Sequence, residues 1–471
     1  MKFKTIAFHH FGCKVNFAEA SSLSRQFQDH GFEIADFHDT ADIYVISTCV
    51  VTAVAEKKCR AAIRQAHKIN PHARIAVIGC FSELKPGELA QMEGVDLVLG
   101  HSAKFQLLEE LARLDQDGQS SAHKHAVENQ NPDCDNAPSG KSEPSTGPLH
   151  AYPDYHGGIT SAVKAGHDAF VPSFSFGDRT RSFLKIQDGC DYYCSYCTIP
   201  LARGRSRSDT IENVVKNALE ISGHGIKEIV LTGVNIGDFG RQNGESFYQL
   251  IRTLGQLEGM NRIRISSIEP DLLNHEIIEF VAASDVFMPH FHIPLQSGSN
   301  KILKAMHRKY NRELYADRVM KIRSLLPHAC IAADVITGFP GETDEDFGDT
   351  FRFLEDLDIS YMHVFTYSKR DNTLAAKMES FVADRVKKER SDRLHRMSED
   401  KKRRFYLQNQ GMEARVLFES DHAMGFMHGF TENYIRVKTA YNPAFVNQVV
   451  EVKLEEPGEG EYIVRIADFL A

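Results

Sequence analysis

The chain has 471 residues, of which 42% are hydrophobic and 25% are charged, and its formal net charge is -9. This length exceeds what one ordinary hydrophobic core can serve, so we expect two to four domains. No apolar run approaches the length of a membrane-spanning helix, and the opening MKFKTIAFHHFGCK is typical of a strand and a polar loop rather than a signal peptide, which predicts a cytoplasmic protein without a membrane partner. The negative charge gives no sign of nucleic-acid binding over the whole chain, so any RNA surface must be a local patch.

The first part of the chain predicts an α/β domain. Residues 1–115 alternate strand-like and helix-like stretches, beginning with KTIAFHH, EASSLSRQFQDHG and DIYVIST, and this alternation favours a doubly wound parallel sheet. Residues 116–178 are polar and rich in Gly, Pro, Ser and His, which predicts a flexible linker.

The central part, residues 179–383, contains six strand-like segments separated by helical patterns: SFLKIQ, EIVLTGV, RIRISSI, HFHIPL, IAADVITGF and MHVFTYS. Six consecutive β–α units fit an open, partial (β/α)6 barrel better than a flat sheet. In such barrels the functional residues lie at the C-terminal ends of the strands. Polar sequences stand at those ends here, among them QDGC, LTGVN, SSIEP, PLQSGS and TGFPGET.

The last part of the chain changes character twice. Residues 384–410 begin with DRVKKERSDRLHRMSEDKKRR and predict an amphipathic, mostly basic helix. Residues 411–471 contain short β-type runs separated by turn residues, which predict a small antiparallel β-barrel.

Disulfides between the nine cysteines are not expected in a reducing compartment, so we first consider metal-binding or catalytic roles for them. Cys190, Cys194 and Cys197 in DGCDYYCSYC stand within one short loop after a predicted strand. Three thiolates can hold three irons of a cubane cluster and leave the fourth iron open. A structural zinc site is the alternative, but it needs four protein ligands, and neither a second close Cys pair nor a fitting His follows.

A second set, Cys13, Cys49 and Cys80, is spread along the first domain. The separations of 49 − 13 = 36 and 80 − 49 = 31 residues are close to the ~30-residue length of a βαβ unit, and each cysteine directly follows a strand-like segment. Because such positions meet in one crevice of a parallel sheet, we expect a second cubane with an open iron. The alternative is that these cysteines are only small, buried side chains at the ends of strands and bind no metal.

Three cysteines fall outside both patterns and are not expected to be ligands: Cys59, Cys134 and Cys330.

The CxxxCxxC loop, with Tyr196 before its last cysteine, resembles the radical S-adenosylmethionine (SAM) superfamily. The resemblance implies that the open iron chelates the amino and carboxylate groups of SAM, and that an electron from the cluster cleaves the sulfonium to a 5'-deoxyadenosyl radical. Gly233 in LTGVN, Gln296 in PLQSGS and Gly338 in DVITGFPGE stand where the superfamily contacts this cofactor. The alternative is that these residues only make tight turns after strands.

Three residues in polar segments are weaker candidates. Arg203 in ARGRSRS and the pair Ser368 and Arg370 in YSKR are interpreted as binders of a carboxylate or phosphate, or else as surface charges.

A three-cysteine domain, a radical SAM barrel and a small C-terminal barrel together resemble the methylthiotransferase family. The branches of this family act on isopentenyladenosine (i6A) in tRNA, on threonylcarbamoyladenosine (t6A) in tRNA, or on an aspartate of a ribosomal protein. The stretches FGCKVNFAEA, STCVVTAVAEKKCR and GCFSELKP look most like the t6A branch. A long linker departs from the family pattern, and a radical SAM methylase that binds cobalamin is a different enzyme class that stays open.

The resemblance implies a reaction, its cofactors and its partners. The enzyme would add a methylthio group to adenine C2 at position 37, using two [4Fe–4S] clusters and two molecules of SAM. One SAM would methylate a sulfur on the open iron of the Cys13, Cys49 and Cys80 cluster, and the other would give the radical. The implied partners are the tRNA anticodon stem-loop, an electron donor such as a flavodoxin or ferredoxin, and a sulfur source.

The last domain of this family is an RNA-binding barrel of the TRAM type, which residues 411–471 resemble loosely. We therefore hypothesise that this barrel and the basic helix hold the anticodon stem-loop through phosphate contacts. The alternative is that the charged residues of the helix only form a face that is exposed to water and bind no RNA. The helix residues concerned are Lys401, Lys402, Arg403 and Arg404.

Overall fold

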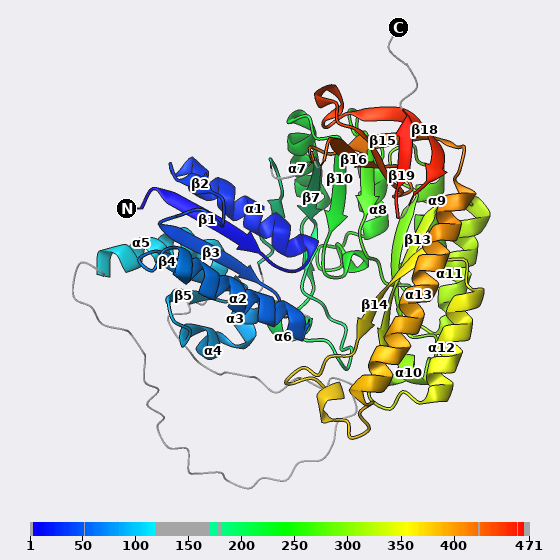
Figure 1. Ribbon diagram of the computed structural model, residues 1–471, viewed down its shortest axis with the longest axis horizontal. Coiled ribbons are helices and arrows are strands. Elements are labelled where there is room, and N and C mark those ends of the chain that lie inside the picture. Colours follow the sequence, from blue (N-terminus) through cyan, green and yellow to red (C-terminus); the bar gives the residue numbers. More distant parts are fainter. Residues whose placement is uncertain are drawn as a thin grey trace.

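The computed structural model describes the chain over residues 3–50, 52–117, 169–177, 180–422, 424–458 and 460–465. Figure 1 shows an N-terminal sheet domain (blue), a central barrel (green to yellow), a long helix along its outside (orange) and a small C-terminal barrel (red). The predicted fold class is therefore confirmed. Among the described residues, no helix combines enough length and apolar character to cross a bilayer.

Five parallel strands in the order β2-β1-β3-β4-β5 form the N-terminal sheet. Every residue of the central strand β3 is buried, so both faces need a cover. Leu23 and Phe27 pack on one face, and Ile63 and Phe81 pack on the other. The strands are β1 (Thr5–His10), β2 (Glu33–Ala35), β3 (Ile43–Thr48), β4 (Arg74–Gly79) and β5 (Val95–Leu99), and the helices are α1 (Lys14–Asp29), α2 (Ala53–Ile69), α3 (Cys80–Leu84), α4 (Pro86–Ala90), η1 (Ala103–Gln106) and α5 (Leu107–Asp117).

The central barrel has six parallel strands in the order β7-β10-β11-β12-β13-β14, as the sequence predicts. Two isolated bridges, Ile263 to Phe287 and Ser267 to His292, join its two sheets. The strands are β7 (Arg181–Lys185), β10 (Glu228–Thr232), β11 (Arg262–Ile265), β12 (His290–Gln296), β13 (Cys330–Thr337) and β14 (Tyr361–Thr366). Smaller elements of this region are β6 (Ser173–Phe174), β8 (Gln187–Asp188), α6 (Ile199–Arg203), β9 (Arg207–Ser208), η2 (Ile236–Asp238) and η3 (Ala375–Lys377).

The helices that cross between these strands begin at capping residues. Each follows a Ser, Thr or Asn whose side-chain oxygen accepts a hydrogen bond from a backbone N–H of the first turn, which satisfies one donor that the helix leaves unpaired. Thr343 and Asp346 form a complete capping box. The helices are α7 (Ile211–Gly223), α8 (Phe247–Leu254), α9 (His275–Ala283), α10 (Asn300–Ala305), α11 (Arg312–Leu325) and α12 (Asp344–Asp356).

The long helix α13 (Asp384–Gln408) matches the predicted basic helix and leads into the C-terminal barrel. This barrel is closed, in the order β15-β16-β17-β19-β18. Its elements are β15 (Glu413–Phe418), β16 (Phe426–Phe430), β17 (Arg436–Ala440), η4 (Pro443–Phe445), β18 (Val449–Pro457) and β19 (Tyr462–Arg465).

The predicted linker, 116–178, lies largely outside the described residues, and Cys134 with it. The prediction was wrong at both ends. Helix α5 continues to Asp117, and Ser173 and Phe174 pair with β7 as strand β6. Arg25 of α1 also donates to the Phe174 carbonyl at 2.7 Å, so this segment is held by the N-terminal domain.

Alternation along the barrel strands gives the central barrel two different sides. The odd-numbered residues of β11 and β13, such as Ile263 and Val335, pack on the outer helices. The other side chains face the lumen, since successive residues of a strand point to opposite faces. At the N-terminal ends of the strands, Glu228 Oε2 accepts from Arg262 Nε at 2.9 Å, and Glu228 Oε1 accepts from Arg264 Nε at 3.0 Å.

The C-terminal barrel packs against this N-terminal end of the central barrel. Arg262 Nη1 donates to the Arg415 carbonyl at 3.0 Å, and Arg264 Nη1 donates to the Glu432 carbonyl at 3.0 Å. Burial would raise the pKa of Glu228, but Arg264 and Arg262 lower it to about 2.

We predict that Glu228→Gln lowers the melting temperature, because it leaves buried arginines without their counter-charge, a loss of about 3–5 kcal/mol. Since the folded pKa is depressed, this contribution is complete above the ordinary value of 4.5 and is lost as the pH falls toward 2. Thermal unfolding at pH 7 and pH 3 measures it. Glu419→Gln is the control, because Glu419 also pairs with an arginine of this end but is more exposed. Equal melting temperatures for both variants at pH 7 would contradict the prediction.

Candidate active site

The CxxxCxxC loop lies at the C-terminal end of the first barrel strand, and each of its three sulfurs accepts a hydrogen bond. Backbone N–H groups of Tyr192 and Ile199 donate to the sulfurs of Cys190 and Cys197, each at 3.4 Å. Arg308 Nη1 donates to Cys194 Sγ at 3.1 Å. Hydrogen bonds onto each sulfur suit a set of iron-ligating thiolates.

Burial raises the pKa of all three thiols, that of Cys197 to about 12, and the charge of Cys194 raises the pKa of both Cys190 and Cys197 further. Burial therefore disfavours the thiolate form at each sulfur. An iron–sulfur cluster fits the site, because the bound iron would supply the charge that the buried thiolates need.

Arg308 and Glu269 form a pair that the sequence analysis missed. Arg308 Nη2 donates to Glu269 next to the cysteines, and Arg308 Nη1 also lies 3.5 Å from the Tyr196 hydroxyl. Burial raises the pKa of Glu269 to about 7, although Arg308 opposes the shift. The SSIEP segment at a strand end signalled Glu269, whereas nothing in the MHRKY segment signals Arg308.

Of the four residues proposed for SAM contact, Tyr196 belongs to this loop, and Gly233, Gln296 and Gly338 stand at the ends of β10, β12 and β13. The Tyr196 ring packs edge-on against Phe339, with centroids 6.4 Å apart. A Cβ on Gly233 would lie 2.9 Å from Gln187 Oε1, so only glycine fits there. Gln296 and Gly338 adopt the left-handed φ angles of 67° and 73°. For a non-glycine residue such as Gln296 this backbone is strained, and strain of this kind clusters at functional sites.

The second cysteine set gathers at the edge of the N-terminal sheet. Cys13 follows β1 and caps α1, Cys49 follows β3, and Cys80 begins α3 after β4. Because β2 and β3 lie on opposite sides of β1, the first two cysteines stand at the point where the strand order reverses, where open α/β sheets bind ligands. Asn16 Nδ2 ties the two loops together by donating to the carbonyls of Phe11 and Thr48 at 2.9 and 3.0 Å.

Close packing holds these thiols near one another. Gly12 has a φ of 108°, and a Cβ there would lie 3.1 Å from Cys49 Sγ. Burial raises the pKa of Cys80, and the charges of Arg203 and Cys13 act on it. The three sulfurs are thus a donor set that an iron–sulfur cluster fits, like the first set.

Arg203 links the two cysteine sets. It ends α6, six residues after Cys197, and its Nε donates to Cys80 Sγ at 3.3 Å. Its Nη1 donates to Asp188 Oδ1 at 2.8 Å, and its Nη2 lies 3.2 Å from Glu19 Oε2. Of the two interpretations of Arg203, the surface charge is wrong, because its guanidinium is buried between the two domains, where it binds two carboxylates of the protein itself.

The buried network around Arg203 carries more positive than negative charge. Burial would raise the pKa of Glu19 and Asp188, but the surrounding cations hold both well below their ordinary values. Burial lowers the pKa of His101 to about 3, so this residue is neutral. Two carboxylates thus face four cations, which are Lys104, Lys185, Arg203 and Arg207.

Arg370 is not a surface charge either, because it is buried and binds a carboxylate. Its Nη1 donates to Glu56 Oε1 at 2.5 Å and so fastens the loop after β14 to α2 of the N-terminal domain. Ser368, its neighbour in the same loop, is half-buried.

The four basic residues of α13 do not share one environment. Lys401 is buried, and its Nζ donates to the carbonyls of Glu355 and Leu357 at 3.2 and 2.7 Å. Including Lys401 in an RNA surface was therefore wrong. Arg403 and Arg404 are exposed, and Lys402 is half-buried above the Tyr406 ring.

Two further cysteines lie in apolar cores. Cys59 packs in the core of the N-terminal domain, and burial raises its pKa to about 11. Cys330 packs between the central and C-terminal barrels, where burial raises its pKa to about 12.

Two family descriptions match the chain. The uncharacterized protein family UPF0004 matches residues 5–100, and the radical SAM superfamily matches residues 184–354. A solved structure of the radical SAM methyltransferase TsrM from Kitasatospora setae is similar with a TM-score of 0.52 at 14% identity. This likeness covers 79% of our chain and 77% of that one, and it shows a shared fold.

Curated relatives match nearly the whole chain. The threonylcarbamoyladenosine tRNA methylthiotransferase MtaB of Bacillus subtilis is 37% identical over 98% of our chain and 97% of its own. MtaB of Aquifex aeolicus is 35% identical over 92% of our chain and 96% of its own. The tRNA-2-methylthio-N(6)-dimethylallyladenosine synthase of Pelotomaculum thermopropionicum is 31% identical over 94% and 93%. The chain is therefore a member of the radical SAM methylthiotransferase family, whose enzymes use SAM and a [4Fe–4S] cluster.

Proposed function

We propose that this enzyme adds a methylthio group to C2 of t6A at position 37 of tRNA. The observation that carries the proposal is that Arg203, six residues after Cys197, donates to Cys80, so that the two three-cysteine sets stand at strand ends of two adjoining α/β domains. The choice of t6A rests on the names of four relatives with 31–37% identity, all of which are threonylcarbamoyladenosine tRNA methylthiotransferases.

Two [4Fe–4S] clusters belong to this proposal. Cys190, Cys194 and Cys197 would hold one, and the set formed by Cys13, Cys49 and Cys80 would hold the other. With three protein ligands each, both clusters keep one iron free for a reagent. The net positive network around Arg203 supports the second cluster, because it would offset the negative charge of three thiolates, two of which are buried.

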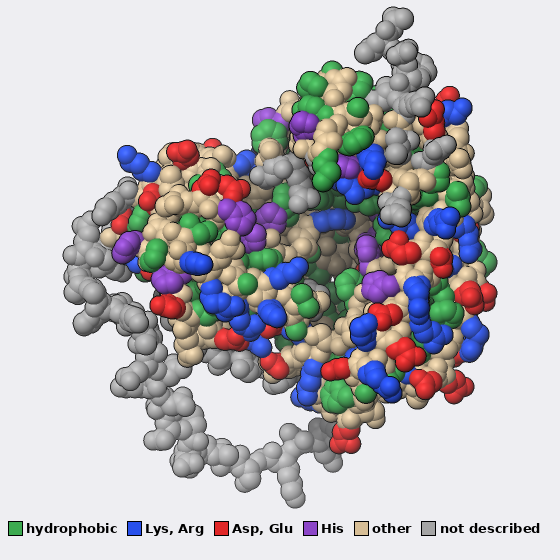
Figure 2. All heavy atoms as spheres, viewed as in Figure 1, with side chains coloured by type: hydrophobic (Ala, Val, Ile, Leu, Met, Phe, Trp, Pro, Cys, Tyr) green, Lys and Arg blue, Asp and Glu red, His purple; other side chains and the backbone are tan. Residues whose placement is uncertain are grey.

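The residues of the radical site position the reagents. Tyr196, Gly233, Gln296 and Gly338 would border SAM, and Arg308 would hold the thiolate of Cys194. The bound cluster and SAM would supply a 5'-deoxyadenosyl radical, which can abstract the C2 hydrogen that a general base cannot reach. Figure 2 shows a hollow between the N-terminal domain and the barrel, through which a base could enter.

The tRNA anticodon stem-loop is the proposed substrate, and a basic surface defined by Lys402, Arg403 and Arg404, together with the C-terminal barrel, is proposed to bind its phosphates. An electron donor such as a flavodoxin or ferredoxin would reduce the clusters, and a separate donor would supply sulfur. We propose that the reaction takes place in the cytoplasm, where these partners and tRNA are present.

Methylthiolation of i6A is the second candidate. Relatives with 30–31% identity are named as synthases of the 2-methylthio dimethylallyl nucleoside. Mass spectrometry of tRNA nucleosides separates the two substrates.

We predict that tRNA from cells lacking this protein loses 2-methylthio-t6A and retains unmodified t6A, as measured by mass spectrometry of tRNA nucleosides. Re-expressed wild-type protein and the Cys59→Ala control should restore the modification. A triple alanine variant of Cys13, Cys49 and Cys80 should not, and its iron content should fall from about eight to about four atoms per chain.

Two results would contradict this prediction. Loss of the 2-methylthio derivative of i6A instead would show that i6A is the substrate. An unchanged iron content in the triple variant would show that Cys13, Cys49 and Cys80 hold no cluster.

We predict that Arg203→Met lowers the reduction potential of the N-terminal cluster, because a charge and a hydrogen bond to Cys80 Sγ are lost. A fall on the order of 50 mV is expected, since 59 mV is a tenfold change for one electron. Redox titration followed by electron paramagnetic resonance measures it in a variant that retains only this cluster. Arg203→Lys should give a smaller fall, and the exposed Arg205→Met should give none. An unchanged potential in Arg203→Met would contradict the role.

We predict that replacing Lys402, Arg403 and Arg404 by alanine weakens tRNA binding and reduces its salt dependence. Each lost phosphate contact should lower the slope of log K against log salt by about 0.7–0.9. Filter binding between 50 and 300 mM KCl measures the slope. The control removes three exposed charges elsewhere on α13, those of Arg385, Lys388 and Arg396. If both variants had the same slope, the basic surface would be merely solvated.

A further inference from the structure

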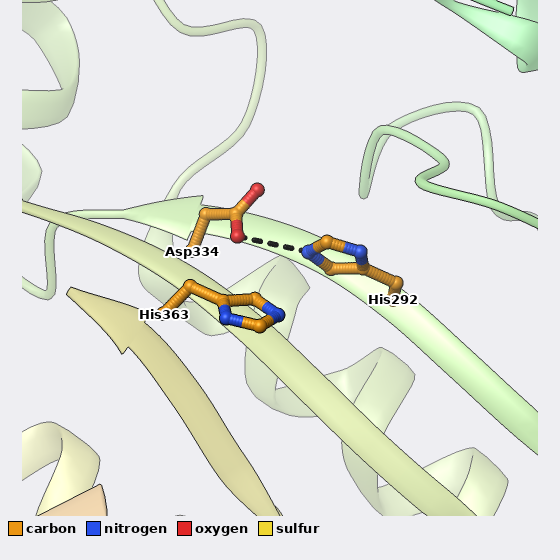
Figure 3. A group of neighbouring side chains, drawn as sticks. All are labelled: His292, Asp334 and His363. Carbon is orange, nitrogen blue, oxygen red and sulfur yellow. Dashed lines mark hydrogen bonds and ion pairs between the residues drawn. The ribbon is translucent and has the colours of Figure 1, made fainter. Parts of the chain in front are cut away.

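Three neighbouring side chains in the barrel lumen are not used by the chemistry described so far. Figure 3 shows His292, Asp334 and His363, from β12, β13 and β14, converging on one point. His292 Nε2 and Asp334 Oδ1 are hydrogen-bonded at 2.9 Å, and the rings of His292 and His363 lie 5.3 Å apart. We call these three residues the lumen triad.

The lumen triad faces an open space. The neighbours Phe291, Ile293 and Ala333 are buried against the outer helices, so alternation turns His292 and Asp334 inward. Their side chains nevertheless keep 19% and 20% exposure, and His363 is exposed. Side chains that face inward and are still exposed border a space that is open to solvent. Figure 2 shows histidines (purple) at the rim of the hollow and a Lys or Arg side chain (blue) within it.

A cation from the other domain lies near this space. Lys14, the first residue of α1, is half-buried and lies within electrostatic reach of Asp334 of the lumen triad and of Arg264 and Arg181. Because Lys14 directly follows Cys13, the lumen triad lies close to the cysteine set proposed to carry the sulfur.

The N-terminal end of the lumen contains a polar side chain without a hydrogen-bond partner. His290, the first residue of β12, is 5% exposed, and neither of its ring nitrogens has a hydrogen-bond partner among the described residues. Its ring packs against Tyr434 at 4.6 Å, with Arg264 above the same tyrosine. A buried polar side chain of this kind points to a ligand or ordered water in the lumen.

Charge decides what kind of ligand fits. The ligand atoms of the lumen triad lie within 4.8 Å of one another, which a divalent metal could bridge. However, Lys14 has no ion-pair partner among the described residues and adds positive charge beside Asp334, which disfavours a metal ion. Arg181 and Arg264 add no free charge, because both pair with Glu228. An anionic ligand that also carries hydroxyl or amide groups satisfies both the lysine and the imidazoles.

We propose that Lys14 and the lumen triad form a subsite for the N6 substituent of the target adenosine, and that this subsite selects a carboxylate. The inference rests on the proposed function. The threonylcarbamoyl group carries a carboxylate for Lys14, and a hydroxyl and a carbamoyl group for the lumen triad. An isopentenyl group offers none of these, and it would leave desolvated polar groups unpaired, which makes a site of this kind selective.

The test compares anticodon stem-loop RNAs that differ only in the N6 substituent. One carries t6A, and the other carries its methylamide, which lacks the negative charge. Fluorescence anisotropy with the reconstituted but unreduced enzyme gives Kd, and single-turnover assays give the rate. The wild-type enzyme should bind the acid at least about tenfold more tightly than the methylamide.

The variants Lys14→Met and His363→Leu should lose this preference, so that the two Kd values agree within about threefold. Binding of the methylamide RNA should change little in Lys14→Met, and an iron content equal to that of the wild type verifies that the cluster beside Lys14 is intact. His275→Ala is the matched control, because His275 forms a similar 2.8 Å pair with Asp317 on the exposed outer helices. This control should keep the full preference.

Several outcomes would overturn the inference. A wild-type enzyme that methylthiolates t6A but binds acid and methylamide alike lacks the carboxylate subsite, and the proposed function stands. An enzyme that methylthiolates only i6A overturns both the subsite and the proposed function. One equivalent of a metal other than iron, retained by the wild type and lost in His363→Leu, would make the lumen triad a metal site instead.

Discussion

The buried ion network around Arg203 is the interaction on which the rest of the structure depends. It joins α1 of the N-terminal domain to the start of the barrel, through Glu19 on one side and Asp188 on the other. Both carboxylates are removed from water, so each charge needs its partner, and the two domains have one strongly preferred arrangement. The same guanidinium contacts Cys80 and lies six residues from Cys197. These charges therefore help to set the relative position of the two cysteine sets.

Much of the fold could be predicted because it follows from local periodicity and from one topological rule. Alternating strands and helices predicted both parallel sheets, and the rule that parallel strands end at one edge placed Cys13, Cys49 and Cys80 together. Contacts between residues far apart in the sequence could not be predicted in this way. Arg308 reaches Cys194 across more than a hundred residues, and no local pattern signals such a pair.

The basic helix shows a different limit of sequence reasoning. Its charge run predicts a solvated surface, but which lysine turns inward depends on helical phase. Leu394, Lys401 and Phe405 share the buried face of α13, and two of these three are apolar. The spacing from Leu394 to Phe405 is three helical turns, so the phase was present in the sequence but was hidden by the charge of Lys401.

The C-terminal barrel, which packs against the N-terminal ends of the central strands, has a consequence for the order of events. Arg262 and Arg264 bond to its backbone carbonyls, so it covers that end among the described residues. Under the proposed function, SAM and the target base would both approach from the C-terminal ends of the strands. RNA that bound first would hinder the entry of the smaller molecule. We therefore expect SAM to bind before the RNA and to leave after it.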